Sequence, residues 1–396
     1  MSVRAGVGPG GSGANLPVLR GHNAALVLDL LRTAGTGGIS RLELAERTGL
    51  TPQAVSKITA RLRTEGLAAE AGRRASTGGK PRTVLRLVRS AAYAVGLHLD
   101  RDELTAVVVD LAGAPVAART VPFDLGAGAE RVVAEAAEQV AAVRADAARA
   151  LAVRDPLDAA RPQPPGSLPR GPLGVGVAMP GPLDHVTGVP RRVTGFPEWE
   201  GFPLRDALAA RLRLPVVLDK DTNAAALGLA LKGAPAGRGD SFAYLHLGTG
   251  LGAGLVLGGV LHRGARTGAG EFGHQVIQLD GPLCGCGNRG CVEALCLAAV
   301  ARGDLDEAAR ILGEGAANLV ALLDIDRVLL GGRTVTAHEE CFVRGVRAVL
   351  TARAGGAGIP VAPAGGGAHA VAEGAAQLVL APVFGRRRGR EPELGG

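Results

Sequence analysis

The sequence lacks any long uncharged apolar run. Hydrophobic residues make up 47% of its 396 residues, yet no stretch of about 20 residues is free of charge, histidine and glycine clusters, so no membrane span is expected. Residues 1–21 hold six glycines and no sustained apolar segment, so we expect a disordered lead-in and not a secretory signal. We therefore expect a cytoplasmic protein whose thiols are reduced or bound to metal.

Cysteine is also scarce. The chain has five cysteines, and three of them, Cys284, Cys286 and Cys291, lie within eight residues. The glycines between them let the backbone fold back, and His274 supplies an imidazole from upstream. A Cys3His set is closed to a catalytic water, so the spacing predicts a structural zinc site. The alternative is a chance grouping of buried thiols and a core histidine, and the concentration of cysteine in one segment favours the metal site.

Acidic residues are few at the N-terminal end. Residues 1–90 carry 14 lysines and arginines against 5 acidic residues, a net charge of +9, whereas the remaining 306 residues sum to −2. A basic domain on a near-neutral body indicates a polyanionic partner, although basic surface is often only solvated charge. A second basic run begins at Arg386, and we interpret residues 386–396 as a basic disordered tail, with contact to DNA as the alternative.

Three helices are predicted in the basic end. Residues 23–33 place apolar side chains at helical spacing, Ser40 can cap a second helix, and Thr51 with Pro52 can begin a third. The apolar residues of the third helix face inward, which leaves a polar face of the kind that a recognition helix presents to the major groove. That face consists of Gln53, Ser56, Lys57 and Arg61.

Two short strands are predicted after these helices. Residues 67–70 and 83–87 alternate around a glycine- and arginine-rich segment that contains Lys80 and Arg82. The three helices, the two strands and the basic loop between the strands together predict a winged helix-turn-helix at residues 22–90. Its wing is expected to enter a neighbouring minor groove of the DNA. A bare three-helix bundle with a polar face is the alternative; the tight turn at residues 48–50, the wing and the charge favour DNA binding.

The segment around the cysteines closely resembles one protein family. Residues 247–264 read LGTGLGAGLVLGGVLHRG, residues 269–276 read AGEFGHQV, and residues 284–294 read CGCGNRGCVEA. This run resembles the ROK family of repressors, open reading frames and sugar kinases, and the Gly-Gly-Lys-Pro-Arg wing is similar to the wing of ROK repressors. The resemblance implies an α/β protein in which a winged helix-turn-helix precedes a two-lobed, actin-like (ribonuclease H-like) sugar kinase fold.

The resemblance also implies a domain division and a sugar site. We expect a ROK domain at residues 91–385, with lobe one at about 91–216 plus 360–385 and lobe two at about 217–359. Residues 217–228 align with the family motif that carries the catalytic base, which places Asp221 at the base position. Taken singly, such carboxylates are more often ordinary exposed groups. The predicted ligand-binding residues are Lys220, Asp221, Asn223, Glu271, His274 and Glu293.

Departures from the kinase pattern point away from catalysis. The first phosphate-binding turn, Asp-x-Gly-x-Thr in kinases of the family, is replaced by His98-Leu-Asp100-Arg-Asp102, whose carboxylates would repel ATP. The second turn, at residues 248–250, is kept. Lys220 replaces an asparagine that fixes a sugar hydroxyl in relatives. Its ammonium either neutralises the neighbouring carboxylates or reaches into the cleft, where it would favour an anionic sugar.

These observations favour a transcription regulator over an enzyme. We expect a homodimer or homotetramer that binds a double-stranded DNA operator and responds to a sugar or sugar derivative, with repression of carbohydrate genes as the usual outcome in the family. The first alternative is an ATP-dependent sugar kinase that carries a DNA-binding domain. The second is a regulator that has lost its small ligand and answers to a protein partner.

Overall fold

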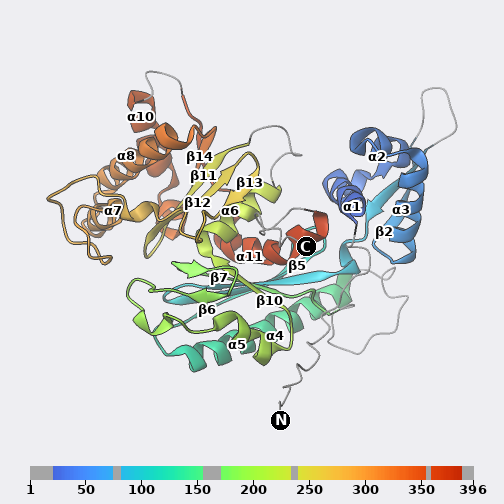
Figure 1. The fold of residues 1–396 in the computed structure, drawn as a ribbon, viewed down its shortest axis with the longest axis horizontal. Coiled ribbons are helices and arrows are strands. Elements are labelled where there is room, and N and C mark those ends of the chain that lie inside the picture. Colours follow the sequence, from blue (N-terminus) through green and yellow to red (C-terminus); the bar gives the residue numbers. More distant parts are fainter. Residues whose placement is uncertain (1–20, 75–81, 155–170, 233–239, 354–357, 386–396) are drawn as a thin grey trace, which may run out of the picture.

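The computed structural model describes residues 21–74, 82–154, 171–232, 240–353 and 358–385. Figure 1 shows a small N-terminal domain beside a larger body with two lobes. The predicted lead-in before residue 21, Lys80 of the wing and the tail at residues 386–396 lie outside the described residues. None of the described helices is both long and apolar enough to span a membrane.

The N-terminal domain has the predicted winged helix-turn-helix topology. It contains α1 (His22–Ala34), α2 (Arg41–Thr48) and α3 (Pro52–Thr64), and a sheet in the order β1-β3-β2 formed by β1 (Ile39–Ser40), β2 (Ala68–Arg74) and β3 (Arg82–Leu87). β2 and β3 are antiparallel, as the alternating segments predicted.

Local sequence explains where these helices begin and end. The Ser40 hydroxyl accepts from the backbone N–H of Glu43, whose carboxylate accepts from the N–H of Ser40, so the two residues form a capping box. Gly49 ends α2 in the left-handed region at φ 70°. The Thr51 hydroxyl then caps α3, with Pro52 in its first turn. The predicted caps are confirmed.

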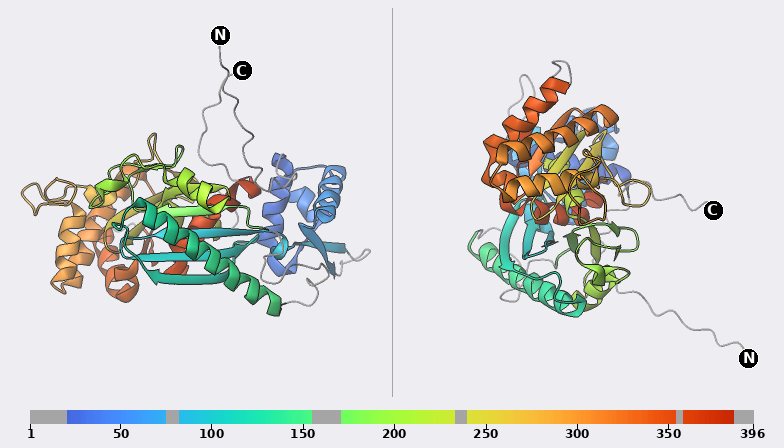
Figure 2. Two further views of the ribbon diagram at one scale, coloured as in Figure 1. Left: turned by 90° about the horizontal axis from the view of Figure 1, so that it is seen from below. Right: turned by 90° about the vertical axis from the view of Figure 1, so that its left-hand side faces the viewer.

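The first lobe is built on a mixed five-stranded sheet in the order β10-β7-β4-β5-β6. Its strands are β4 (Tyr93–Leu99), β5 (Glu103–Asp110), β6 (Pro115–Pro122), β7 (Val175–Met179) and β10 (Val216–Lys220). α4 (Ala129–Arg154) and α5 (Leu204–Leu212) cover its outer face (Figures 1 and 2). A two-stranded ribbon, β8 (Leu183–Asp184) with β9 (Val189–Pro190), follows β7.

The second lobe repeats this plan with another five-stranded sheet, in the order β13-β12-β11-β14-β15. Its strands are β11 (Phe242–Leu247), β12 (Leu251–Leu257), β13 (Val260–His262), β14 (Arg327–Gly331) and β15 (Val361–Pro363). The helices of this lobe are α7 (Val292–Ala301), α8 (Leu305–Leu323), the short α9 (Arg333–Ala337) and α10 (Glu339–Arg353). β10 pairs with the first sheet and β15 with the second; the lobe boundaries stay predictions.

Two helices lie between the sheets, α6 (Asp221–Lys232) and α11 (Ala370–Leu380), as Figure 1 shows. Glycines let α11 lie directly on the first sheet: a Cβ at Gly96 would come within 1.8 Å of the carbonyl oxygen of Ala372, and one at Gly176 within 1.8 Å of that of Ala375. The lobes are stacked as sheet, helix, helix and sheet, and α11 touches the backbone of the first sheet at these two glycines.

A continuous apolar core joins the N-terminal domain to the first lobe. It contains Leu28 and Leu31 of α1, Val109 of β5, Leu380 of α11 and Phe384 of the following 3-10 helix (Ala381–Phe384), all buried. Burial of several large apolar side chains in one core contributes many kcal/mol, at about 25 cal/mol per Å² of apolar surface. The N-terminal domain and the first lobe therefore form one packed unit.

Candidate functional site

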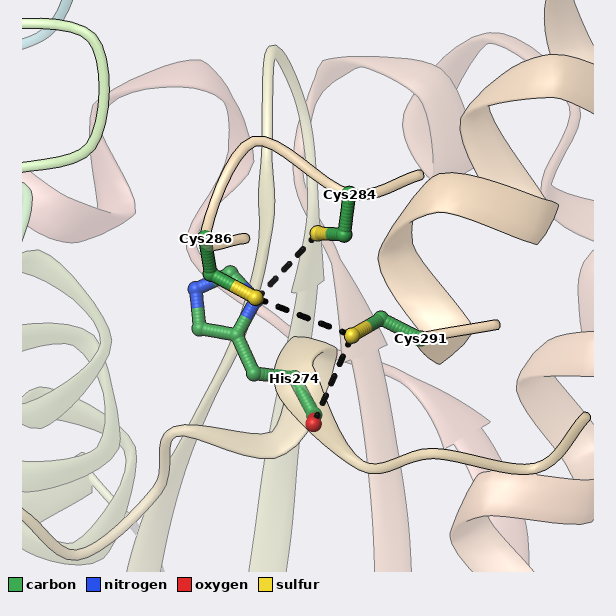
Figure 3. Close-up of side chains that lie close together, drawn as sticks. All are labelled: His274, Cys284, Cys286 and Cys291. Carbon is green, nitrogen blue, oxygen red and sulfur yellow. Dashed lines mark hydrogen bonds between the residues drawn. The ribbon is translucent and has the colours of Figure 1, made fainter. Parts of the chain in front are cut away.

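The four predicted metal ligands lie together in the second lobe. The ligand atoms of His274, Cys284, Cys286 and Cys291 all lie within 4.8 Å of one another (Figure 3). The Sγ of Cys284 is 3.7 Å from Nδ1 of His274, and the Sγ atoms of Cys286 and Cys291 are also 3.7 Å apart. The structure therefore brings together a set that could hold a metal ion.

A tight loop produces this grouping. The backbone N–H of Cys284 donates to the carbonyl of Asn288 at 2.7 Å, and that of Gly287 donates to the carbonyl of Cys284 at 2.9 Å. Gly290 has φ 65°, and a Cβ there would lie 1.6 Å from the carbonyl oxygen of Gln278, so only glycine fits. Cys291 then precedes α7 as its N-cap residue.

The donor set fits zinc in chemistry and in size. With Zn–S bonds of about 2.3 Å, tetrahedral geometry places two thiolates about 3.8 Å apart, close to the 3.7 Å between Cys286 and Cys291. Burial, with hydrogen bonds that this thiol donates to the sulfurs of Cys286 and Cys284, raises the pKa of Cys291 to about 12. Binding of a metal must therefore displace a proton from this thiol.

A cleft between the lobes opens beside the metal centre. Asp221 begins α6 at its wall and accepts from the backbone N–H of Thr222 at 2.6 Å. Burial, with Asp100 and Glu271 nearby, raises the pKa of Asp221 to about 7. Five of the six predicted ligand residues line this cleft. The full lining is Asp100, Arg101, Pro180, Gly181, Thr194, Lys220, Asp221, Thr222, His246, Thr249, Gly250, Leu251, Gly252, Gly270, Glu271, His274 and Glu293.

Lys220 reaches across the cleft to the second lobe. Its Nζ donates to Oε1 of Glu271 at 2.9 Å and to the carbonyl oxygen of Ala269 at 2.5 Å, and its side chain is only 3% exposed. This geometry supports the interpretation that the ammonium neutralises a carboxylate. The partner is Glu271, because Asp219, beside Lys220 in the chain, is paired with Arg263 at 2.7 Å.

Asn223 is not among the residues that line the cleft. Its side chain is fully buried, and its Nδ2 donates to Oδ1 of Asp219 at 2.8 Å. Asp219 also accepts from the guanidinium of Arg263, which follows β13. Asn223 thus supports a buried ion pair between the lobes, and its predicted role in ligand binding stays a prediction.

The replaced phosphate turn forms an ion-pair cluster across the cleft. Arg333, at the start of α9, donates to both carboxylate oxygens of Asp102 at 2.5 and 3.1 Å, and to Asp100 at 3.1 Å. The hydroxyl of Thr249, in the second phosphate turn, faces Asp100 at 3.4 Å. The sequence analysis identified the two carboxylates but missed Arg333. The local sequence hints at this arginine only by its position directly after Gly331-Gly332.

Buried imidazoles lie behind this cluster. The ring of His246 on β11 is hydrogen-bonded through Nδ1 to the hydroxyl of Tyr244 at 2.8 Å. Burial, together with the nearby His98, lowers the pKa of His246 to about 4, and burial also lowers the pKa of His98. Both rings are therefore neutral at physiological pH. Sequence reasoning missed His246 as a residue of the cleft.

The predicted DNA-binding face of α3 is exposed. Gln53, Ser56, Lys57 and Arg61 all face solvent, and Val55 and Leu62 are buried. No carboxylate of the described residues forms a salt bridge with Lys57 or Arg61. Two basic side chains are thus available to a polyanion beside two neutral side chains that can donate and accept hydrogen bonds.

Arg82 is exposed at the start of β3. It pairs with Arg74 in the register between β2 and β3, so it lies at the base of the predicted wing. Basic charge therefore continues from α3 toward the wing.

Comparison with known proteins identifies both parts of the chain. A sequence model of the ROK family matches residues 167–302, and a model of winged helix-turn-helix DNA-binding domains matches residues 27–68. The solved structure of a ROK hexokinase from Thermus thermophilus is 32% identical, with a TM-score of 0.53, over 72% of this chain and 96% of that chain. The chain belongs to the ROK family. The predicted two-lobed, actin-like fold is confirmed.

Two further relatives match different shares of this chain. A solved structure described as a ROK family transcriptional regulator, a homologue of the E. coli MLC protein, covers 91% of this chain and 96% of its own, with a TM-score of 0.68 and 20% identity. The xylose repressor of Bacillus subtilis is 30% identical over 255 residues, 64% of this chain. The alignment spans 61% of that repressor's length. At 20% identity the first likeness shows a shared fold.

Proposed function

We propose that this ROK protein is a sequence-specific DNA-binding regulator, a repressor of genes for carbohydrate metabolism, whose body senses a sugar without phosphorylating it. The observation that carries the proposal is the exposed face of α3, with Lys57 and Arg61 free of carboxylate partners among the described residues. The name of the xylose repressor, a relative at 30% identity, supports a sugar-responsive repressor.

In this proposal α3 enters the major groove of an operator. Lys57 and Arg61 would contact groove edges or phosphates, and Gln53 and Ser56 would distinguish bases by hydrogen bonds. Arg82, with Lys80 outside the described residues, would place the wing in the adjacent minor groove. Two such domains in a homodimer, or a homotetramer built from dimers, would match two half-sites of a pseudo-palindrome in the cytoplasm.

The body would bind the sugar in the interlobe cleft. Asp221, Glu271 and Glu293 would offer acceptors to its hydroxyls, the ring N–H of His274 that faces away from the metal would offer a donor, and Lys220 would set the charge that the ligand meets. A structural zinc ion at the Cys3His set would hold His274, which lies in both the metal set and the cleft lining. When bound, the ion would supply rigidity to this wall of the cleft and no reactive water.

A kinase is the second candidate, and one observation favours it. The pKa of Asp221, raised to about 7, suits a general base at neutral pH. We infer a non-enzyme nevertheless, because the phosphates of a nucleotide would have to displace the ion pairs of Arg333 with Asp100 and Asp102 and then face those two carboxylates.

A selection from random duplex DNA tests the proposal. We expect the full chain to enrich a pseudo-palindromic site, which the Arg61→Ala variant binds at least about tenfold more weakly. Arg302→Ala, which removes an exposed arginine of the second lobe, is the matched control and should bind as the parent does. If no sequence is enriched at moderate salt, the protein is not a sequence-specific regulator.

A further inference from the structure

One helix reaches from the ligand cleft to the N-terminal domain. Asp221 is the first residue of α6 and lines the cleft. Near the other end of α6, the backbone carbonyl of Leu231 accepts a hydrogen bond from Nη1 of Arg32 at 3.1 Å. Arg32 belongs to α1 of the winged domain. Asp221 and Leu231 are ten residues apart on α6, or about 15 Å along the helix axis.

The guanidinium of Arg32 is held in place on its own side. Its Nε and Nη2 donate to Oδ1 of Asp29 at 3.0 and 2.7 Å, and it lies over the ring of Phe384 with 5.2 Å to the ring centroid. The side chain is 12% exposed. A cation at the C-terminal end of α6 also meets the negative end of the helix dipole. The contact with Leu231 is therefore both directional and charge-assisted.

α6 and α11 cross through backbone contact between two glycines. A Cβ at Gly228 of α6 would lie 3.0 Å from the Cα of Gly374, and a Cβ at Gly374 would lie 2.0 Å from the carbonyl oxygen of Ala224. At the glycines the two backbones touch directly, and around them side chains of both helices, such as Ala225 of α6 with Val371 and Ala375 of α11, belong to one buried core. Beyond the crossing, Lys232 pairs with Glu373 of α11, which sets the resting position of this end of α6.

The two helices pack on different sheets, although α6 also continues directly from β10 of the first sheet. α11 lies on the first sheet through Gly96 and Gly176, and it shares an apolar core with α1 of the winged domain. α6 lies on the second sheet, since a Cβ at Gly254 of β12 would meet the carbonyl oxygen of Thr222 at 2.1 Å. α6 is thus tied to both lobes, so a change in lobe closure would shift it relative to α11 and the winged domain.

We propose that α6 is a lever, pivoted where Gly228 crosses Gly374, that transmits cleft closure to the winged domain through the contact between Leu231 and Arg32. This inference rests on the proposed function, whose sugar-sensing step it makes concrete. Gly228 is seven residues from Asp221 and three from Leu231, or about 10 and 4.5 Å along the helix. A movement of about 2 Å at the cleft thus becomes a movement of about 1 Å at Leu231, enough to break a hydrogen bond of 3.1 Å.

A double-mutant cycle tests the lever without any ligand. Gly228→Ala forces α6 away from α11. Arg32→Met removes the hydrogen bond to Leu231 but keeps an apolar side chain. Amide hydrogen exchange of residues 29–34 is measured in the parent, in both single variants and in the double variant. We expect Gly228→Ala to speed exchange there about threefold or more in the parent background and to add nothing in the Arg32→Met background. Gly358→Ala, with no atom within 4 Å of its Cβ, is the control for a glycine replacement.

Two results would overturn the lever. One is an unchanged exchange rate at residues 29–34 in Gly228→Ala, and the other is the same acceleration with and without Arg32. Arg32→Leu, which also lacks a donor for the Leu231 carbonyl, serves as a second variant if Arg32→Met does not fold.

Affinity for the selected operator fragment is measured on the same four proteins. We expect Gly228→Ala to change the Kd about threefold or more only when Arg32 is present. If none of the four binds a specific sequence, the proposed function fails, while the exchange data still decide whether α6 acts on α1.

Discussion

Arg333 of the second lobe and Asp102 of the first are joined by two parallel hydrogen bonds, 2.5 and 3.1 Å long, across the mouth of the cleft. Such a two-point pair between guanidinium and carboxylate fixes both groups in one plane. The ion pair lowers the pKa of Asp102 and raises that of Arg333. Both side chains are about half-exposed, so the pair acts as an orienting contact more than as a large source of stability.

This pair leads to a prediction about nucleotides. We expect millimolar ATP to leave the melting temperature of the protein unchanged, and common hexoses and amino sugars to remain unphosphorylated, because the phosphate turn is occupied by carboxylates. The measurement is a coupled ADP assay on the parent and on Asp221→Asn. Steady turnover in the parent that Asp221→Asn abolishes would establish the kinase alternative, since only a working base makes that carboxylate indispensable.

Features fixed by neighbours in the chain could be predicted from the sequence. The Ser40 cap, the turn at Gly49 and the Thr51-Pro52 start of α3 depend on residues within one helical turn. The metal set was also predictable, because its three cysteines are confined to one loop whose length limits how far apart their sulfurs can lie.

Contacts between distant segments could not be predicted in this way. Arg333 and Asp102 are 231 residues apart, and the sequence around either residue does not indicate that the two form a pair. Asn223 is a different case. Residues two apart on a helix point in nearly opposite directions, which explains why Asp221 lines the cleft while Asn223 of the same helix is turned toward Asp219.

The metal centre gives a second prediction. We expect one zinc ion per chain in purified protein, and less than about half an equivalent in Cys286→Ser, because three donors bind zinc far more weakly than four. Elemental analysis with a melting curve measures content and effect together, and a chelator should lower the melting temperature of the parent. Cys341→Ser, outside the set, should keep its zinc; equal zinc content in both variants would contradict the assignment.

DNA binding should divide into two kinds of contact. We expect Arg82→Ala to weaken binding to all sequences and to lower the salt slope by about one for each phosphate that the variant no longer neutralises. Gln53→Ala should instead reduce the difference in affinity between the selected site and a single-base variant of it, because a side-chain amide reads base edges. Titrations at several salt concentrations separate these outcomes, and the assignment of α3 fails if Gln53→Ala only shifts every affinity equally.

The raised pKa of Asp221 predicts a pH-dependent stability. Between its ordinary value of 3.8 and about 7, the folded protein holds a proton that the unfolded chain has released, so this group lowers the free energy of unfolding as the pH rises through that window. Asp221→Asn removes the effect. The free energy of unfolding of Asp221→Asn should exceed that of the parent only slightly at about pH 4.5, and by on the order of 2 kcal/mol at about pH 8. The difference stays this small because the side chain of Asp221 keeps some contact with solvent. Denaturant curves measure it, with Glu200→Gln, an exposed carboxylate, as the control; an equal advantage at both pH values would contradict the shift.

The ion pair of Lys220 with Glu271 gives the last prediction, which concerns the charge of the ligand. The ammonium is buried against Glu271, so it is already neutralised and offers little net charge to an anionic sugar. Replacing it with asparagine would free Glu271 to accept from a sugar hydroxyl. We therefore expect D-glucose and D-xylose to raise the melting temperature of Lys220→Asn more than that of the parent, and glucose 6-phosphate to have no advantage over glucose in the parent. If the parent prefers the phosphorylated or an acidic sugar and Lys220→Asn loses that preference, the pair with Glu271 opens on binding, and Lys220 selects an anion.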